Sequence, residues 1–535
     1  MSAGIGSEAV GNLPPNPAVH ELAVADHAER PEQSSGLFGR GLLYVVVLSF
    51  QTVAATIVSP VLAHLIGPGE FGRLAAAIAL YQLLTALAVL GLDQAIVLQR
   101  AEDGNSRAAR GLVSVALVLI LVVVGAAALT SRLWGPALGF DGASPLLGVT
   151  LLWTLPGAPV GIALALLLAE DRLKVFAVVS AIAAVGGQLV GIVLLLVLGR
   201  EALIYACGGV VSQVVAFSIA MVAVRPCLRG LADWSIARRA IMLGAPLAVS
   251  GIAGFVLNAG DRIIIQRMLG AAEVGRYQVA YTIGYVVVML LVFVGQAWIP
   301  RIAAISDQRH RLVVHEHSRN QLYLLLLPMI LGVSLGAPLA LRVFAPASFE
   351  PETLSIVVFL VALSAFPVAA AGTSGRELLT LRKGRALALV ACVAAAANVA
   401  LNIVLIPYFG ITGAAGATVL AFALTAVLQL RMLPRGTPWP KSPVWLWLAI
   451  IGVCGAAAAS TFLPQTSAWN VGRIVVALAC LPWLIGRLKV ARDTAPFESL
   501  EEPDAPEPPT GIDGHDATTD TRTPARRRPH SAERP

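Results

Sequence analysis

The sequence predicts an all-α integral membrane protein with about fourteen transmembrane helices. We expect two parallel six-helix lobes around a central cavity, followed by two C-terminal helices. Composition is the first of three observations that predict this fold. Of 535 residues, 57% are hydrophobic and 13% are charged, and the mean hydropathy is +0.79. Soluble domains carry about 25% charged residues, so we expect most of the chain to lie in a bilayer.

The same composition excludes several classes of function. The net charge of +7 comes from residues between apolar segments and not from a basic run with aromatics, so no nucleic-acid partner is expected. The five cysteines show neither zinc nor disulfide spacing. The chain has no phosphate-binding loop, zinc-protease motif or nucleophile elbow. We therefore expect no enzyme, no cofactor and no metal.

The two ends of the chain differ from the rest. Residues 1–40 are polar and rich in proline, without the basic and apolar regions of a signal peptide, and residues 492–535 are rich in proline and charge. Both are predicted to be disordered cytoplasmic tails.

Between these tails, the chain divides into apolar segments of the length that a membrane helix needs, which is about 20 residues. The predicted helices span residues 42–64, 74–97, 111–133, 146–169, 175–198, 202–224, 241–268, 278–299, 321–343, 354–375, 386–408, 411–433, 444–463 and 470–490.

Loop charge is the second observation. Lys and Arg gather in alternate loops, within residues 100–110, 172–174, 225–239, 301–319, 376–385 and 431–441. The positive-inside rule places these loops in the cytoplasm. We therefore expect a multi-pass protein of the inner (plasma) membrane with both termini in the cytoplasm, as an even number of helices requires.

An internal repeat is the third observation. LIGPGEFGRL at residues 65–74 and MLGAAEVGRY at residues 268–277 share Gly, Glu, Gly and Arg at a constant offset of 203. A gap-free offset indicates duplication. Six helices separate the copies, and an even number returns the chain to its starting side, so the two units are parallel. We expect an N-lobe at 41–230, a C-lobe at 231–435 and helices 13 and 14 at 436–491.

The segment that ends in the second copy of the repeat carries polar residues on one face. Asn258, Arg262 and Gln266 are spaced by four, with Asp261 beside them. Charge within a bilayer is costly and usually faces a cavity or a partner. These four residues are therefore candidates for lining the cavity, and the alternative is that Asp261 and Arg262 neutralise each other as a structural pair.

The first half supplies the remaining candidate site residues. Thr52, Thr56 and Ser59 form a polar stripe on the predicted helix 42–64, which the first copy of the repeat follows, and Ser59 corresponds to Arg262 at the offset of 203. Asp93 and Arg100 lie toward the end of the second segment. There they either line an inner vestibule or mark the membrane interface.

A longer motif points to a family. Residues 398–418 read NVALNIVLIPYFGITGAAGAT, which resembles the N-x-x-L-N-x-x-L-I-P-x-x-G-x-x-G-A-A-x-A-T pattern of polysaccharide transporters. These include the Wzx-type oligosaccharide flippases of the multidrug/oligosaccharidyl-lipid/polysaccharide (MOP) exporter superfamily. Residues 67–72 and 261–277 resemble the same family. The resemblance covers roughly residues 40–490 and is stronger in the second half, because the first-half counterpart of the motif has lost its Asn and Pro.

This resemblance implies a transporter that works by alternating access. It would flip a polyprenyl-pyrophosphate-linked oligosaccharide, a precursor of a cell-surface polysaccharide such as lipopolysaccharide or exopolysaccharide, from the inner to the outer leaflet. Arg262 would contact the anionic headgroup. Implied partners are membrane lipid, a polysaccharide polymerase and glycosyltransferases. The alternatives are a lipid II flippase, multidrug or cation efflux, and a membrane glycosyltransferase or polymerase, although the loops have no room for a catalytic domain.

Overall fold

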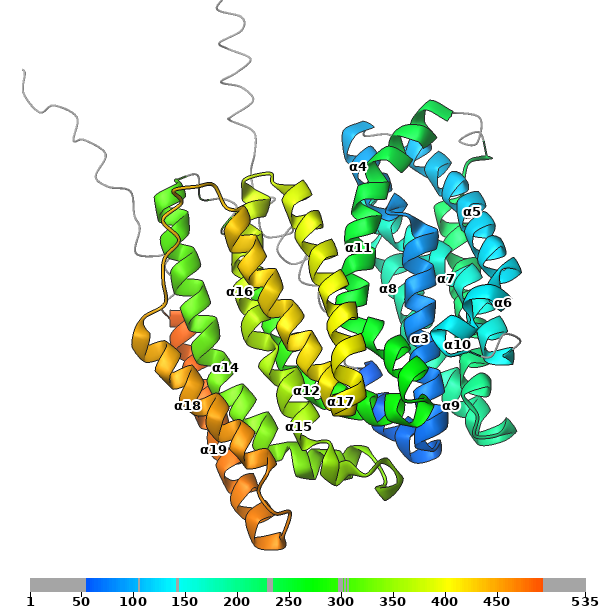
Figure 1. The fold of residues 1–535 in the computed structure, drawn as a ribbon. Helices are drawn as coiled ribbons and strands as arrows, with labels where there is room; N and C mark the ends of the chain where they lie inside the picture. Colours follow the sequence, from blue (N-terminus) through cyan, green and yellow to red (C-terminus); the bar gives the residue numbers. More distant parts are fainter. Residues whose placement is uncertain are drawn as a thin grey trace, which may run out of the picture.

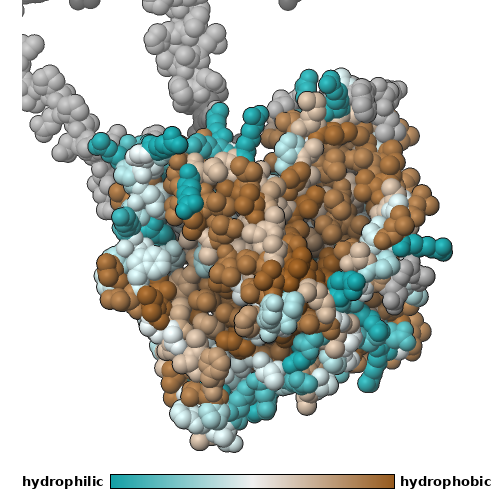
Figure 2. Space-filling view, viewed as in Figure 1, coloured by the Kyte–Doolittle hydropathy of each residue, from teal (hydrophilic) through white to brown (hydrophobic). Residues whose placement is uncertain are grey.

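The computed structural model describes residues 54–103, 106–140, 144–228, 234–296, 302, 305 and 307–493. Every regular element of this part of the chain is helical, and twelve of its helices are long and apolar enough to cross a membrane. Figure 2 shows a band of hydrophobic side chains, with hydrophilic side chains gathered toward two opposite ends. The predicted all-α membrane fold is confirmed. The predicted tails lie outside the described residues, except for residues 492 and 493, which are the last two residues of the helix Ser467–Asp493.

The first described helix of the first half is Ala54–Leu65. The elements that follow are α3 (Pro68–Val89), α4 (Leu92–Asp103), α5 (Ser106–Leu129), α6 (Ser131–Trp134), η1 (Pro136–Leu138), α7 (Pro145–Ala169), α8 (Leu173–Ala181), the π-helical η2 (Ile182–Gly186), α9 (Gly187–Leu198) and α10 (Ala202–Val224).

The second half begins with α11, which contains the polar face predicted from the sequence. Its elements are α11 (Trp234–Met268), α12 (Ala271–Gln296), α14 (Gln308–Phe344), η4 (Ala347–Phe349), η5 (Pro351–Thr353), α15 (Ser355–Leu363), α16 (Ala365–Thr380), α17 (Gly384–Met432), α18 (Val444–Thr461) and α19 (Ser467–Asp493).

Two elements account for the difference between twelve spans and the expected fourteen. Helix α17 has 49 residues, and Gly410 within it has φ +57°, so its backbone turns between the predicted helices 386–408 and 411–433. Glycine adopts a positive φ without strain. Ala54–Leu65 is the described part of the predicted helix 42–64 and is too short to count as a span by itself. The number fourteen stays a prediction.

Two predicted helices are interrupted. Leu90 and Gly91, with φ of 50° and 71°, separate α3 from α4 within the predicted helix 74–97. Ser364 separates α15 from α16 within 354–375. Hydropathy averaged over a helix-length window does not detect such breaks, because Leu90, Gly91 and Ser364 lie within stretches that are largely apolar.

The helices form two groups that meet along α3, α11 and α12. Figure 1 shows α3 to α10 on one side and α12 to α17 on the other, with α18 and α19 along the outer edge of α14. Helix α11 packs against both α3 and α17, and α12 packs against both α3 and α15. This arrangement matches the expected fold of two helical units and a C-terminal pair, while the exact boundaries 41–230, 231–435 and 436–491 stay predictions.

The two copies of the repeat contact each other. A Cβ atom on Gly72 would overlap the carbonyl oxygen of Ala271, and one on Gly275 would overlap that of Pro68. At the offset of 203, Pro68 corresponds to Ala271 and Gly72 to Gly275, so the contact is reciprocal, as at a two-fold axis. Glycine allows the backbones of α3 and α12 to approach this closely.

Candidate functional site

A cavity of about 710 Å³ lies where the two groups of helices meet. Its walls come from Ala54–Leu65, α3, α7 and the α8–α10 region on one side, and from α11 and α12 on the other. Its size is typical of sites for small molecules or headgroups. In the described part of the chain, Arg262 is the single charged residue that lines it, among amides, hydroxyls and aromatic rings.

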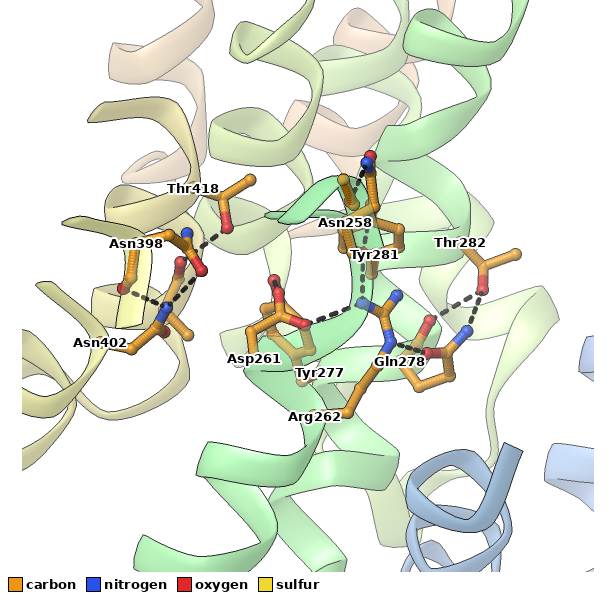
Figure 3. A network of polar contacts seen from close by, with 12 residues as sticks. Asn258, Asp261, Arg262, Tyr277, Gln278, Tyr281, Thr282, Asn398, Asn402 and Thr418 are labelled. Carbon is orange, nitrogen blue, oxygen red and sulfur yellow. Dashed lines mark hydrogen bonds and ion pairs between the residues drawn. The ribbon is translucent and has the colours of Figure 1, made fainter. Parts of the chain in front are cut away.

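The guanidinium of Arg262 is held by groups from two helices (Figure 3). Its Nη1 donates to Asp261 Oδ1 at 2.8 Å and to the carbonyl of Asn258 at 2.8 Å, and its Nε donates to Gln278 Oε1 at 2.9 Å. The guanidinium carbon lies 4.1 Å from the ring centroid of Tyr281, at cation–π distance. These hydrogen bonds use Nε and Nη1, and Nη2 takes part in none of them.

Asp261 lies behind the arginine and does not line the cavity. It is 2% exposed and also accepts a hydrogen bond from the hydroxyl of Tyr277, which is fully buried. A buried charge needs a counter-charge and hydrogen bonds to be tolerated. Both sequence interpretations therefore describe part of the arrangement, since Asp261 and Arg262 form a buried ion pair and Arg262 also faces the cavity.

A second polar cluster lies on α17, which packs against α11 (Figure 3). Asn398 and Asn402 are fully buried, and Asn402 Nδ2 donates to the carbonyl of Asn398 at 2.9 Å and to its Oδ1 at 3.2 Å. Thr418 Oγ1 donates to the carbonyl of Ala414 at 3.2 Å. The two asparagines and the threonine of the sequence motif are thus inside the second half, and none of them lines the cavity.

The structure brings three of the nine predicted site residues to the cavity wall: Arg262, Asn258 and Ser59. Gln266 instead donates to the carbonyl of Gly139 at 3.2 Å, because it lies one turn beyond the cavity on α11. Thr56 is described but is not a lining residue, and Thr52 lies outside the described residues.

Asp93 and Arg100 are also away from the cavity, and this favours the interpretation that they mark the interface. Both lie on α4, which contributes no lining residue. Asp93 accepts a hydrogen bond from its neighbour Gln94 at 3.0 Å. The break at Leu90–Gly91 separates α4 from the part of α3 that reaches the cavity.

The polar residues of the first-half wall, apart from Ser59, are not among the site residues that the sequence predicts. The uncharged groups there include Tyr81, Gln82, Trp153, Ser180, Gln188 and Gln213. Each glutamine stands inside a segment that is otherwise apolar, and this was the available signal. Within the described residues, no group of three His, Cys, Asp or Glu side chains is placed to hold a metal ion.

Comparison with known proteins places this architecture in a family. The sequence profile of the polysaccharide biosynthesis protein family matches residues 38–306, just over half of the chain. The match ends before the 398–418 motif. The probable low-salt glycan biosynthesis flippase Agl15 of Haloferax volcanii is 26% identical over 188 residues, which are 35% of this chain and 39% of that relative. The matched part is thus less than two thirds of the relative's length.

Solved structures share the fold. The lipid II flippase MurJ in its inward closed conformation superposes with a TM-score of 0.64 at 14% identity, over 84% of this chain and 99% of that chain. A multidrug resistance MATE family transporter of the MOP superfamily, inward-facing, gives a TM-score of 0.54 at 16% identity, over 75% and 95% of the two chains. Fold and family profile agree: the chain belongs to the polysaccharide biosynthesis protein family, and it has the fold of the MOP superfamily transporters.

Proposed function

We propose that this protein flips a polyprenyl-pyrophosphate-linked oligosaccharide from the inner to the outer leaflet of the plasma membrane by alternating access. The observation that carries the proposal is Arg262, the single cationic side chain among the described lining residues, on the wall of a cavity between the two halves whose other polar groups are uncharged. Family membership and the similarity to a glycan biosynthesis flippase support a substrate of this kind.

Arg262 is suited to the pyrophosphate. A guanidinium presents N–H groups in a plane that matches phosphate oxygens. Its ion pair with Asp261, its hydrogen bond to Gln278 and the Tyr281 ring fix its position, so little side-chain entropy is lost on binding. The amides and hydroxyls around it would solvate the sugars, while the lipid chain stays in the bilayer.

Multidrug or cation efflux fits this cavity less well. A cationic substrate needs an accessible carboxylate, and the lining residues of the described chain include none. Asp261 is buried and committed to Arg262 and Tyr277. A lipid II flippase remains the second candidate because the fold is shared with MurJ. Cytoplasmic termini, and a polymerase and glycosyltransferases as partners, belong to the same proposal.

Reconstitution tests the proposal. Full-length protein in proteoliposomes is given a radiolabelled polyprenyl-pyrophosphate disaccharide, and transfer between leaflets is measured by exposure of the sugar to an external glycosidase. We expect protein-dependent transfer that Arg262→Ala abolishes or strongly slows. Arg267→Ala is the matched control, since Arg267 is an exposed arginine on the same helix and does not line the cavity. Equal transfer by the wild type and Arg262→Ala would remove the role of Arg262, and no transfer by the wild type would overturn the proposed function.

A further inference from the structure

The two walls of the cavity differ in chemistry. The wall from α11 and α12 carries the charge of Arg262, whereas the lining residues from α7 to α10 carry none in the described chain. The first-half wall instead combines glutamine amides, serine hydroxyls and aromatic rings. A charge on one side and neutral hydrogen-bonding groups on the other suit a ligand that has an anionic part and a neutral part.

Four polar atoms on this neutral wall have no hydrogen-bond partner among the described residues. They are Trp153 Nε1, Ser180 Oγ, Gln188 Oε1 and Gln213 Oε1, and all four belong to residues that line the cavity. Buried polar groups in proteins are nearly always paired. These four atoms make no hydrogen bond with the described residues, so a ligand that reaches them competes with no protein partner there.

A π-helical turn shapes the same wall. Ser180, Ala183, Ala184, Gly187 and Gln188 line the cavity at spacings of three and four residues across η2. The small side chains in the middle of this stripe leave room, and its polar ends flank that room. Single π turns inside α-helices often occur at functional sites.

The turn is stabilised from α10. Ser212 Oγ donates to the carbonyl of Ile182, and Gln213 Nε2 donates to the carbonyl of Ala183 at 3.3 Å. Gln213 is therefore anchored through its amide nitrogen, while its amide oxygen has no partner in the described residues.

An aromatic pair completes the wall. The rings of Tyr81 and Trp153 stack with centroids 4.7 Å apart. A Cβ atom on Gly157 would overlap the hydroxyl of Tyr81, and one on Gly209 would overlap the indole of Trp153. Both rings therefore rest against glycine backbone that a larger residue would displace. Fixed aromatic faces of this kind pack against the C–H face of a pyranose ring.

We infer that the first-half wall is a subsite for an uncharged, hydroxyl-rich sugar unit. The Tyr81–Trp153 pair packs against its apolar face and the amides of Gln188 and Gln213 bind its hydroxyls, while Arg262 holds the phosphate across the cavity. A sugar carboxylate placed here would lose its hydration without gaining a counter-charge. The subsite therefore selects neutral sugars over hexuronic acids. This inference rests on the proposed function.

The test measures binding by the detergent-solubilised full-length protein to three probes: bare polyprenyl pyrophosphate, the same lipid with a neutral disaccharide, and the same lipid with a hexuronic acid. We expect the double variant Gln188→Leu, Gln213→Leu to bind the neutral glycolipid about tenfold more weakly, from two lost hydrogen bonds. It should bind the bare lipid within about twofold of the wild type. Ser218→Ala, at an exposed site on α10, is the control and should change neither affinity.

The outcomes separate the two proposals. If Arg262→Ala weakens binding of all three probes but the glutamine variant weakens none, the sugar subsite is wrong and the proposed function stands. If the hexuronic probe binds the wild type as tightly as the neutral probe, the selectivity is wrong. If Arg262→Ala alters no affinity, the phosphate role fails. Should the double variant not fold, as judged by its thermal unfolding, Gln188→Leu alone is used, with an expected loss of about threefold.

Discussion

The helices that precede the two copies of the internal repeat both line the cavity, but they carry different side chains. Before the second copy, α11 carries the ion pair Asp261–Arg262, and at the offset of 203 the first helix has Val58 and Ser59. Val58, Ser59 and Arg262 all line the cavity. Ser59 and Arg262 are thus equivalent in sequence and both line the cavity, but only the position in the second half is charged.

Differences between α12 and α3 explain why this buried charge occurs in the second half only. Around Arg262, α12 provides a hydroxyl for Asp261, an amide for the guanidinium and a ring beneath it. The equivalent positions of α3 have no such groups: Leu74, Ala75 and Ile78 stand where α12 has Tyr277, Gln278 and Tyr281. A buried cation needs its counter-charge and its hydrogen-bond partners together. The backbone that the two halves share is therefore not enough to accommodate a buried cation.

Replacing Asp261 is expected to have the largest effect on stability. Asp261→Val introduces the first-copy residue and leaves Arg262 buried without its counter-charge, so we expect the free energy of unfolding to fall by about 3–5 kcal/mol. Denaturant titration of the purified protein measures this. Glu352→Gln is the control, because its pair with Arg342 is largely exposed and should be worth less than about 1 kcal/mol.

Replacing Asp261 and Arg262 together tests whether the two charges compensate each other. The double variant Asp261→Val, Arg262→Ser copies the first repeat and removes both charges together, so we expect it to regain most of the stability that Asp261→Val loses. It should nevertheless fail to flip the lipid-linked disaccharide. A double variant as unstable as Asp261→Val would contradict the view that the pair is mutually compensating.

Arg262→Lys tests whether the positive charge alone is enough for the wall from α11 and α12 to bind phosphate. Lysine retains the charge but lacks the planar fork. We expect the affinity for polyprenyl pyrophosphate to drop by roughly 1.5–3 kcal/mol, the range for a hydrogen bond to a charged group, as measured by binding to the purified protein. An affinity equal to that of the wild type would show that a point charge suffices.

Gly72→Ala probes the contact where the two copies meet. The added methyl group would overlap backbone of α12, so we expect a loss of about 1–3 kcal/mol in unfolding free energy. Gly67→Ala, in the same motif, meets no atom within 4 Å and is the matched control. Equal stability of the two variants would mean that the reciprocal contact is not tight.

The smallest effect is expected at Ser59, the counterpart of Arg262. A single neutral hydroxyl contributes at most about 0.5–1.5 kcal/mol, so Ser59→Ala should slow flipping by less than about tenfold in the proteoliposome assay. A loss as large as that of Arg262→Ala would show that the two walls are functionally equivalent, contrary to their chemistry.

The sequence alone determined that this protein lies in a bilayer and that it consists of two repeated units. Helix-length apolar segments indicated the bilayer, and the fixed offset of 203 predicted the paired units whose Gly72 and Gly275 contact each other. It also identified Arg262, because a charge within an apolar segment is costly and therefore conspicuous.

Only the tertiary structure decided which polar residues share the cavity. Helical spacing puts Gln266 on the face of Arg262, yet it contacts Gly139 beyond the cavity. Gln188 and Gln213, each a lone amide in an apolar segment, line it. The sequence pattern around an uncharged amide in such a segment is nearly the same whether the amide faces lipid, a neighbouring helix or a cavity. Helix packing and helix breaks such as Leu90–Gly91 determine which environment the amide faces. Both depend on contacts between residues that are distant in the chain.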